Sequence, residues 1–318
     1  MNKLIDFNAY PIDKQLKMLL KDKTTGKNII FATSAYSRNG ISIKETDEIT
    51  VEVLRRGISY QIQPRVLKKR ELQQERTRAK AEVFTPSWLC NKMNNYCDEE
   101  WFGRKSVFNT EQGQKWQVNA EKIEFDTKDG WKKYVDSKRL EITCGEAPYI
   151  VSRYDAATGE MIELKRRIGI LDRKMRVVNE NTDDETEWFK WVLRAYQSVY
   201  GYEFQGDNLL IARINLLITF VDYMQDRWER IATDAELKKI ANIIAWNFWQ
   251  MDGITDAIPL CGEIEEYHQF SLFDFVTDDK SEKQRDEKSR KVYCRIYDWR
   301  SGRSLTYKSM KEGRKYEI

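Results

Sequence analysis

Short apolar runs alternate with longer amphipathic segments over the second half of the chain. The runs RLEIT (139–143), VYGYEF (199–204) and IIAWNFWQ (243–250) are short and rich in β-branched or aromatic residues, as buried strands are. Helix-favouring segments lie between them: TEWFKWVLRAYQ, NLLIARINLLITFVDYM and ELKKIAN. This alternation of strands and helices predicts a doubly wound α/β sheet.

The N-terminal third has a less regular pattern. KQLKMLLKD (14–22) predicts a helix, whereas NIIFATSAYS (28–37) and TVEVL (50–54) predict short strands. Residues 64–84 form a long run of straight-chain side chains that begins at a proline and favours a helix. We therefore expect an N-terminal arm followed by the main domain.

A further helix is predicted over residues 87–102, SWLCNKMNNYCDEEWF, with Ser87 as its N-cap. Four apolar residues with near-helical spacing are its candidate buried face: Trp88, Leu89, Met93 and Cys97. Residues 103–137 show no clear period. The expected organisation is an arm (1–64), a main domain (65–276), and a charged link with a basic tail (277–318).

Composition narrows the class of protein. The chain has 318 residues, of which 41% are hydrophobic, so it can bury a core. We find neither an apolar run of the roughly 18 residues that a membrane span needs nor a signal peptide, which predicts a soluble, cytoplasmic protein. Five scattered cysteines without a CxxC pair indicate neither a disulfide framework nor a zinc cage. A single His268 argues against most histidine-based catalysis.

Charge is nearly balanced overall, at +3, but unevenly distributed. Residues 65–80 hold seven basic and two acidic residues, and residues 280–318 hold 13 basic and 6 acidic residues. Clustered cations suit contacts to DNA phosphates, although a solvated helix face produces the same pattern. The candidate DNA-binding residues are Lys68, Lys69, Arg70, Arg76 and Arg78.

Glycine and acidic residues follow two of the predicted strands. In an open α/β sheet, ligands bind beyond the carboxyl ends of the strands. A turn at residues 144–148 (CGEAP) follows the first strand, and Glu203 ends the second, where a carboxylate commonly accepts hydrogen bonds from ribose hydroxyls. Gln250 and Asp252 follow the third strand, where an amide or acid can bind an adenine edge. Each of these features alone is equally typical of a capped turn that binds no ligand.

Several of these segments together resemble the adenine-specific (N6) DNA methyltransferases of restriction-modification systems, of the restriction endonuclease subunit M type. AEVFTPSWLCNKM (81–93) is similar to the family's EVFTP-x-x-L-x-x-x-M motif, and LEITCGEA (140–147) is similar to its LDPACGSG turn. GYEFQGDNLLIARINLL (201–217) and WQMDGI (249–254) are similar to the next two motifs. The resemblance extends from about residue 65 to 260.

The resemblance implies a Rossmann-like sheet that binds S-adenosylmethionine and a protein that acts on double-stranded DNA. Glu203 would bind the ribose, and Asp252 the adenine edge. The residues that it places around the cofactor are Phe84, Thr85, Pro86, Glu141, Cys144, Gly145, Glu146, Ala147, Glu203, Gln250 and Asp252.

The sequence departs from the family in two places. Glu146, Ala147 and Pro148 make the turn more crowded and more acidic than the family pattern. The catalytic Asn-Pro-Pro-Tyr motif, which binds the extruded adenine, is absent, since none of the five prolines are adjacent. We therefore expect a cofactor-binding portion that ends before the catalytic strand and is inactive alone. Its sheet edge would then be covered by residues 291–307 or by a second chain carrying the catalytic half, and a restriction subunit is a further possible partner.

Two other interpretations remain open. A non-catalytic DNA-binding or assembly subunit could keep the fold without the chemistry. A metal-dependent nuclease could use Asp155, Glu163 and Lys165, although DAATGE (155–160) also has the composition of a turn between strands. The aromatic clusters WFKW (188–191) and WNFW (246–249) could stack on bases, but core packing is the more common role for such residues.

Overall fold

A parallel sheet of three short strands lies at the centre of the protein. In this computed structural model, its strands β3 (Arg139–Glu141), β4 (Val199–Glu203) and β5 (Phe248–Gln250) follow the order β3-β4-β5. The chain is therefore a mixed α/β protein, and the three strands predicted for the main domain are confirmed. The structure describes residues 4–36, 43–55, 62–68, 73–74, 76–78, 85–261 and 291–313.

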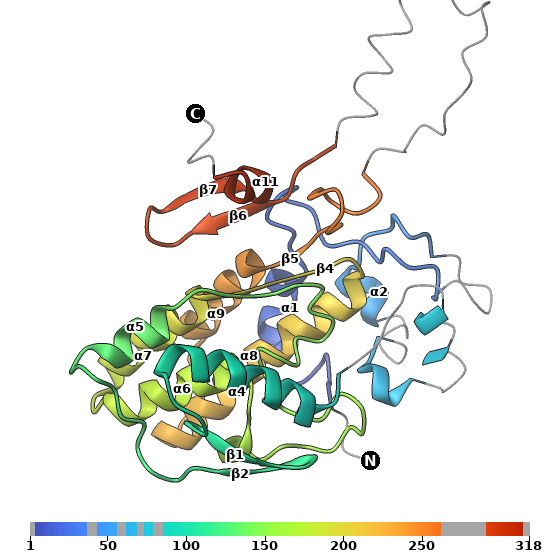
Figure 1. Ribbon diagram of the computed structural model, residues 1–318. Coiled ribbons are helices and arrows are strands. Elements are labelled where there is room, and N and C mark those ends of the chain that lie inside the picture. Colours follow the sequence, from blue (N-terminus) through green and yellow to red (C-terminus); the bar gives the residue numbers. More distant parts are fainter. Residues whose placement is uncertain are drawn as a thin grey trace, which may run out of the picture.

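The two faces of the sheet are covered by different parts of the chain (Figure 1). Five helices cover one face: α5 (Gly130–Asp136), α6 (Ile170–Asn181), α7 (Glu185–Gln197), α8 (Gly206–Trp228) and α9 (Asp234–Asn247). A C-terminal unit covers the other face: β6 (Arg295–Asp298), β7 (Arg303–Thr306) and α11 (Tyr307–Lys311). Because strand side chains alternate, Val199 belongs to the main core, whereas Tyr202 belongs to a second core beneath β6 and α11.

Arg213 on α8 joins the N-terminal arm to the main domain. Its guanidinium is fully buried and donates to the carbonyl oxygens of Leu19 (2.5 Å), Lys21 (2.9 Å) and Phe248 (2.8 Å). Burial lowers its pKa to about 10, so the side chain stays charged at neutral pH. Arg213 thereby fixes the end of α1 (Ile12–Leu20), the predicted first helix, beside β5.

Three expectations for the N-terminal region are corrected. Residues 51–54, expected as a strand, lie in the short helix α2 (Val51–Arg55), and Ile30 makes only an isolated antiparallel bridge, with Glu48. The helix expected from Pro64 onward is interrupted early, although residues 73–74 and 76–78 are helical as expected. A single 3-10 turn, η2 (Arg65–Leu67), is followed by Lys68 in an extended conformation.

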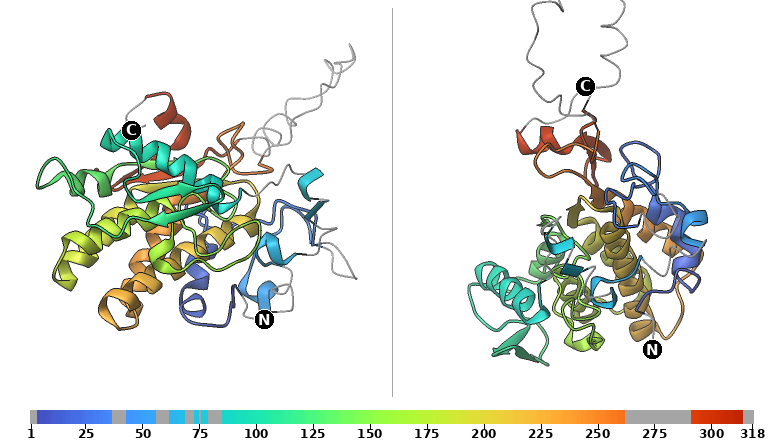
Figure 2. Two further views of the ribbon diagram at one scale, coloured as in Figure 1. Left: turned by 60° about the horizontal axis from the view of Figure 1, so that its bottom comes forward. Right: turned by 90° about the vertical axis from the view of Figure 1, so that its right-hand side faces the viewer.

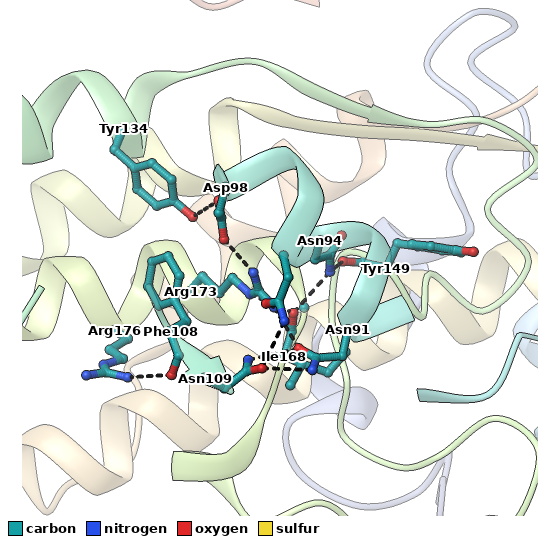
Figure 3. Close-up of polar contacts among 12 residues, drawn as sticks. Asn91, Asn94, Asp98, Phe108, Asn109, Tyr134, Tyr149, Ile168, Arg173 and Arg176 are labelled. Atoms are coloured by element: carbon teal, nitrogen blue, oxygen red, sulfur yellow. Dashed lines mark hydrogen bonds and ion pairs between the residues drawn. The ribbon is translucent and has the colours of Figure 1, made fainter. Parts of the chain in front are cut away.

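The helix α4 (Ser87–Phe102) forms as predicted, but a different face is buried (Figure 3). Asn91, Asn94 and Asp98 point into the protein, whereas Met93 is 50% exposed. The reason is the guanidinium of Arg173 on α6, which hydrogen-bonds to Asn91 Oδ1 (2.8 Å) and pairs with Asp98. A buried charge needs polar partners, and α4 supplies them.

Residues 103–137, which showed no period, contain α5 and the antiparallel hairpin of β1 (Asn109–Gln112) and β2 (Lys115–Val118). Figure 2 shows this hairpin and α4 on the opposite side of the sheet from the N-terminal arm. Within the described part of the chain, no helix combines the length and hydropathy needed to span a membrane.

Candidate functional site

The turn that follows β3 has an alternating backbone conformation. Thr143, Gly145 and Ala147 have positive φ values of 49°, 53° and 62°. Positive φ costs a non-glycine residue roughly 1–2 kcal/mol, so this turn holds strain at Thr143 and Ala147. Alternating backbone of this kind turns N–H groups toward one point, where they can hold an anion.

One N–H of the turn contacts the carboxylate of Glu203, at the end of β4. Its Oε2 accepts from the Gly145 N–H (2.9 Å), and its Oε1 accepts from the Gln205 N–H (3.1 Å). Because β3 and β4 are parallel neighbours, their carboxyl ends meet, and the turn and Glu203 are in direct contact. Glu203 is 7% exposed, so the contact lies below the surface.

A second carboxyl group, Glu141, lies under the same turn. Its Oε1 accepts from the Tyr149 N–H (3.4 Å), while its Oε2 is shielded from solvent and has no partner among the described residues. Burial, with a contribution from the nearby charge of Glu203, raises the pKa of Glu141 well above its usual value. A carboxyl group with a raised pKa therefore lies at the end of β3, beside the Glu203 carboxylate at the end of β4.

Glu146 and Asn215 hold the far end of the turn. The buried Glu146 carboxylate accepts from the Arg65 N–H (2.6 Å) and from the Tyr154 hydroxyl (2.7 Å). Asn215 on α8 donates to the Glu146 carbonyl (3.2 Å) and to the Tyr154 oxygen (3.0 Å). Glu146 therefore binds protein groups, which does not suit the cofactor contact that we expected of it. Cys144 and Ala147, which belong to the turn, are buried.

Gln250, at the end of β5, is bonded to the N-terminal arm. Its amide makes a two-way contact with the backbone of Ile30, accepting from the N–H (2.9 Å) and donating to the carbonyl (2.9 Å), and it also donates to the Phe204 carbonyl (2.8 Å). The arm passes so close to Gly206 that a Cβ there would lie 1.9 Å from the Ile30 oxygen. The adenine-edge role expected of Gln250 does not suit this geometry, because its amide is already satisfied.

Asp252 lies in the turn after β5. Its Oδ1 accepts from the Ile254 N–H (2.9 Å), and its backbone N–H donates to the Ala257 carbonyl (2.8 Å). Asp252 is half-buried. The three strand-end positions are therefore not equivalent.

The segment that precedes α4 lies beside the turn only in part. Thr85 hydrogen-bonds with the side chain of Tyr149, whose carbonyl accepts from Asn94 (2.9 Å). Pro86 occupies the N-cap position expected for Ser87, which is instead the first helical residue. Phe84 lies outside the described residues.

Two of the five candidate DNA-binding residues are buried. The side chains of Lys68 and Arg76 are 1% and 2% exposed and pair with Asp207 at 3.1 and 2.9 Å. Burial opposes ionisation of Asp207, but these two cations outweigh it and hold its pKa below the usual range. Lys68 and Arg76 therefore do not suit phosphate contacts. Arg78 is exposed, and Lys69 and Arg70 lie outside the described residues.

The residues of the nuclease interpretation have structural roles. Asp155 accepts from the Ser87 N–H (2.7 Å), which caps α4, and from the N–H groups of Ala157 (2.9 Å) and Thr158 (2.8 Å). Glu163 precedes a 3-10 turn, η3 (Leu164–Arg166). Over the described ranges, no group of three or more His, Cys, Asp or Glu side chains is placed to hold a metal ion.

Most of the clustered aromatic residues belong to the core. Trp188, Phe248 and Trp249 are each no more than 2% exposed. They pack in the main core or in the second core beneath α11. Base stacking by these three residues is therefore not supported.

In comparisons with known proteins, no protein-family model, curated protein or solved structure matches this chain.

Proposed function

We propose that this chain binds S-adenosylmethionine at the carboxyl ends of β3 and β4, as the cofactor-binding portion of a DNA adenine-N6 methyltransferase of a restriction-modification system. The observation that carries the proposal is the contact between the Gly145 N–H and the Glu203 carboxylate, at 2.9 Å. It joins a glycine turn to a strand-end acid on adjacent parallel strands. The strand order β5-β4-β3 matches the 3-2-1 half of a Rossmann-like sheet.

The groups at this edge fit such a ligand at three positions. The turn from residue 143 to 147 has positive φ values, and this conformation would let the ligand approach the main chain closely. Glu203 would exchange its backbone donors for the ribose hydroxyls. The unpartnered Oε2 of Glu141 offers an acceptor near the cationic part of the ligand, whose charge would favour its ionised form. The adenine edge would need a group other than Gln250.

The bound cofactor would supply a methyl group carried on a sulfonium. Transfer to adenine requires groups that hold the extruded base and its amine. The sequence contains no Asn-Pro-Pro-Tyr motif to do so. We therefore propose that the chain binds the cofactor and that a partner supplies the base-binding groups.

Titration calorimetry with S-adenosylmethionine tests the proposal. We expect saturable binding with a Kd below about 1 mM, weakened about tenfold in Glu203→Gln, because a charged acceptor is replaced by a neutral one. Glu187→Gln, on the surface of α7, is the matched control and should bind as the wild type does. Absence of binding at millimolar ligand, with the fold intact, would contradict the proposal.

A second candidate function is favoured by the satisfied polar groups. Glu203, Gln250 and Asp252 all have protein partners. A non-catalytic DNA-binding or assembly subunit would have such groups. This function predicts no cofactor binding. It predicts that the chain shifts labelled double-stranded DNA in a gel and that the Arg78→Ala variant binds the DNA more weakly.

A further inference from the structure

The strand β3 has an unpaired edge. One side of β3 pairs with β4, and over the described ranges no strand pairs with the other side. The Arg139 and Cys144 N–H groups donate toward the β4 side, to Ser198 (2.9 Å) and Tyr202 (2.8 Å). Because bonding directions alternate along a parallel strand, the backbone N–H and carbonyl of Leu140 face the open side.

Exposed apolar side chains follow the same edge. Leu140 is 41% exposed, and Ile142, in the turn directly after the strand, is 62% exposed. An exposed apolar strand edge is a template for pairing with another strand.

A cavity of about 450 Å³ lies beside this edge, between the sheet and the C-terminal unit. Figure 1 shows that unit covering the sheet face opposite the helices. The wall of the cavity is mostly apolar and aromatic, with Leu140, Tyr200, Trp249, Ile296, Tyr307 and Met310. Lys138, Arg139 and Asp298 also line it. An apolar side chain entering along β3 would fit this cavity, and an acidic neighbour would fit beside its basic residues.

We propose that β3 accepts an extended strand of another polypeptide, with apolar residues directed into the cavity and an acidic residue beside Lys138 and Arg139. The added strand would satisfy the backbone of Leu140, which a small apolar ligand in the cavity would leave unpaired. This inference concerns the opposite side of β3 from Glu203 and does not depend on cofactor binding.

A single strand fits the edge better than a second copy of this chain. Trp101 on α4 lies against Arg139, with the guanidinium 5.7 Å from its ring. A whole sheet brought edge to edge would meet α4 at this point. An added strand needs a spacing of only about 4.8 Å from β3.

A displayed library of random nonapeptides, selected on the full chain, tests the proposal. We expect enriched sequences that alternate apolar with polar residues and include an acid. Fluorescence anisotropy of labelled enriched peptides should show binding about tenfold weaker to Ile142→Lys, which places a charge on the edge. Ile231→Lys is the matched control, because Ile231 is 67% exposed and lies away from β3.

Hydrogen exchange distinguishes strand addition from side-chain docking alone. The bound peptide should slow exchange of the Leu140 amide, and N-methylation of the peptide backbone should abolish binding. Three results would overturn the proposal. They are the absence of enriched peptides, enriched peptides that bind Ile142→Lys as tightly as the wild type, and self-association of the chain that Ile142→Lys abolishes.

Discussion

The carboxyl end of β3 differs from the end of β5 in how completely its polar groups are satisfied. At β5, Gln250 uses its amide oxygen and nitrogen on Ile30 and Phe204. At β3, the turn holds positive φ values, and one oxygen of Glu141 has no partner in the described part of the chain. Strain and unsatisfied polar groups persist where a structure is organised for something other than stability. This difference supports a structural role for the β5 end and is consistent with our proposal that the β3 turn binds a ligand.

Removing the charge of Asp207 should have the largest effect on stability. Asp207→Asn would leave Lys68 and Arg76 buried without a counter-charge, which costs about 3–5 kcal/mol. Urea unfolding followed by circular dichroism measures the loss. Asp222→Asn, at a pair that is 31% exposed on the acid side, should cost less and serves as the control. Equal losses would show that Asp207 has no special role in neutralising Lys68 and Arg76.

Substitution of Gln250 should have the next largest effect. Gln250→Leu would leave the Ile30 N–H and carbonyl without partners, at a cost of about 1–3 kcal/mol. Thermal unfolding measures it, with Gln117→Leu on the exposed β1–β2 hairpin as control. A neutral Gln250→Leu would contradict the structural role that we assign to this end of the sheet.

Substitution of Glu141 should stabilise the protein, in contrast to the two substitutions above. Because its folded pKa is raised, the folded state binds a proton that the unfolded state releases, so stability is greatest below the unfolded pKa and falls as pH rises toward the folded value. Glu141→Gln should remove this pH dependence and stabilise the protein by about 1 kcal/mol at pH 8. Urea midpoints from pH 5 to 8 measure it, and a wild-type stability that rises over this range would contradict the account.

Relief of backbone strain should have the smallest effect. Thr143 is exposed and has φ 49°, so Thr143→Gly should stabilise the protein by about 0.5 kcal/mol after the entropy of the unfolded chain is counted. Thr127→Gly, in a loop without positive φ, should destabilise slightly. Thermal unfolding of both variants decides between strain and a general effect of glycine.

The sheet and the contact at its edge could be predicted from the sequence. The runs ending at Glu141, Glu203 and Gln250 are short and apolar, and helices separate them. Parallel pairing then requires that the turn after β3 meet Glu203, since their strands are neighbours. The proximity of these residues follows from topology.

Long-range polar contacts could not be predicted in the same way. The buried face of α4 is set by Arg173, about 80 residues later in the chain, and the burial of Lys68 by Asp207. A sequence pattern shows that a residue is charged but not whether a distant partner buries it. For the same reason the sequence pattern predicts a strand at Ile30, whereas its backbone bonds to the side chain of Gln250 on β5.

Amide hydrogen exchange with and without S-adenosylmethionine tests the central claim most directly, because it locates the ligand on the chain. The account predicts faster exchange at Gly145 and Gln205, whose N–H groups lose their hydrogen bonds to Glu203 when the ribose hydroxyls replace them, and no change at Ile30 near the end of β5. A change confined to Ile30, or no change anywhere at saturating ligand, would contradict it.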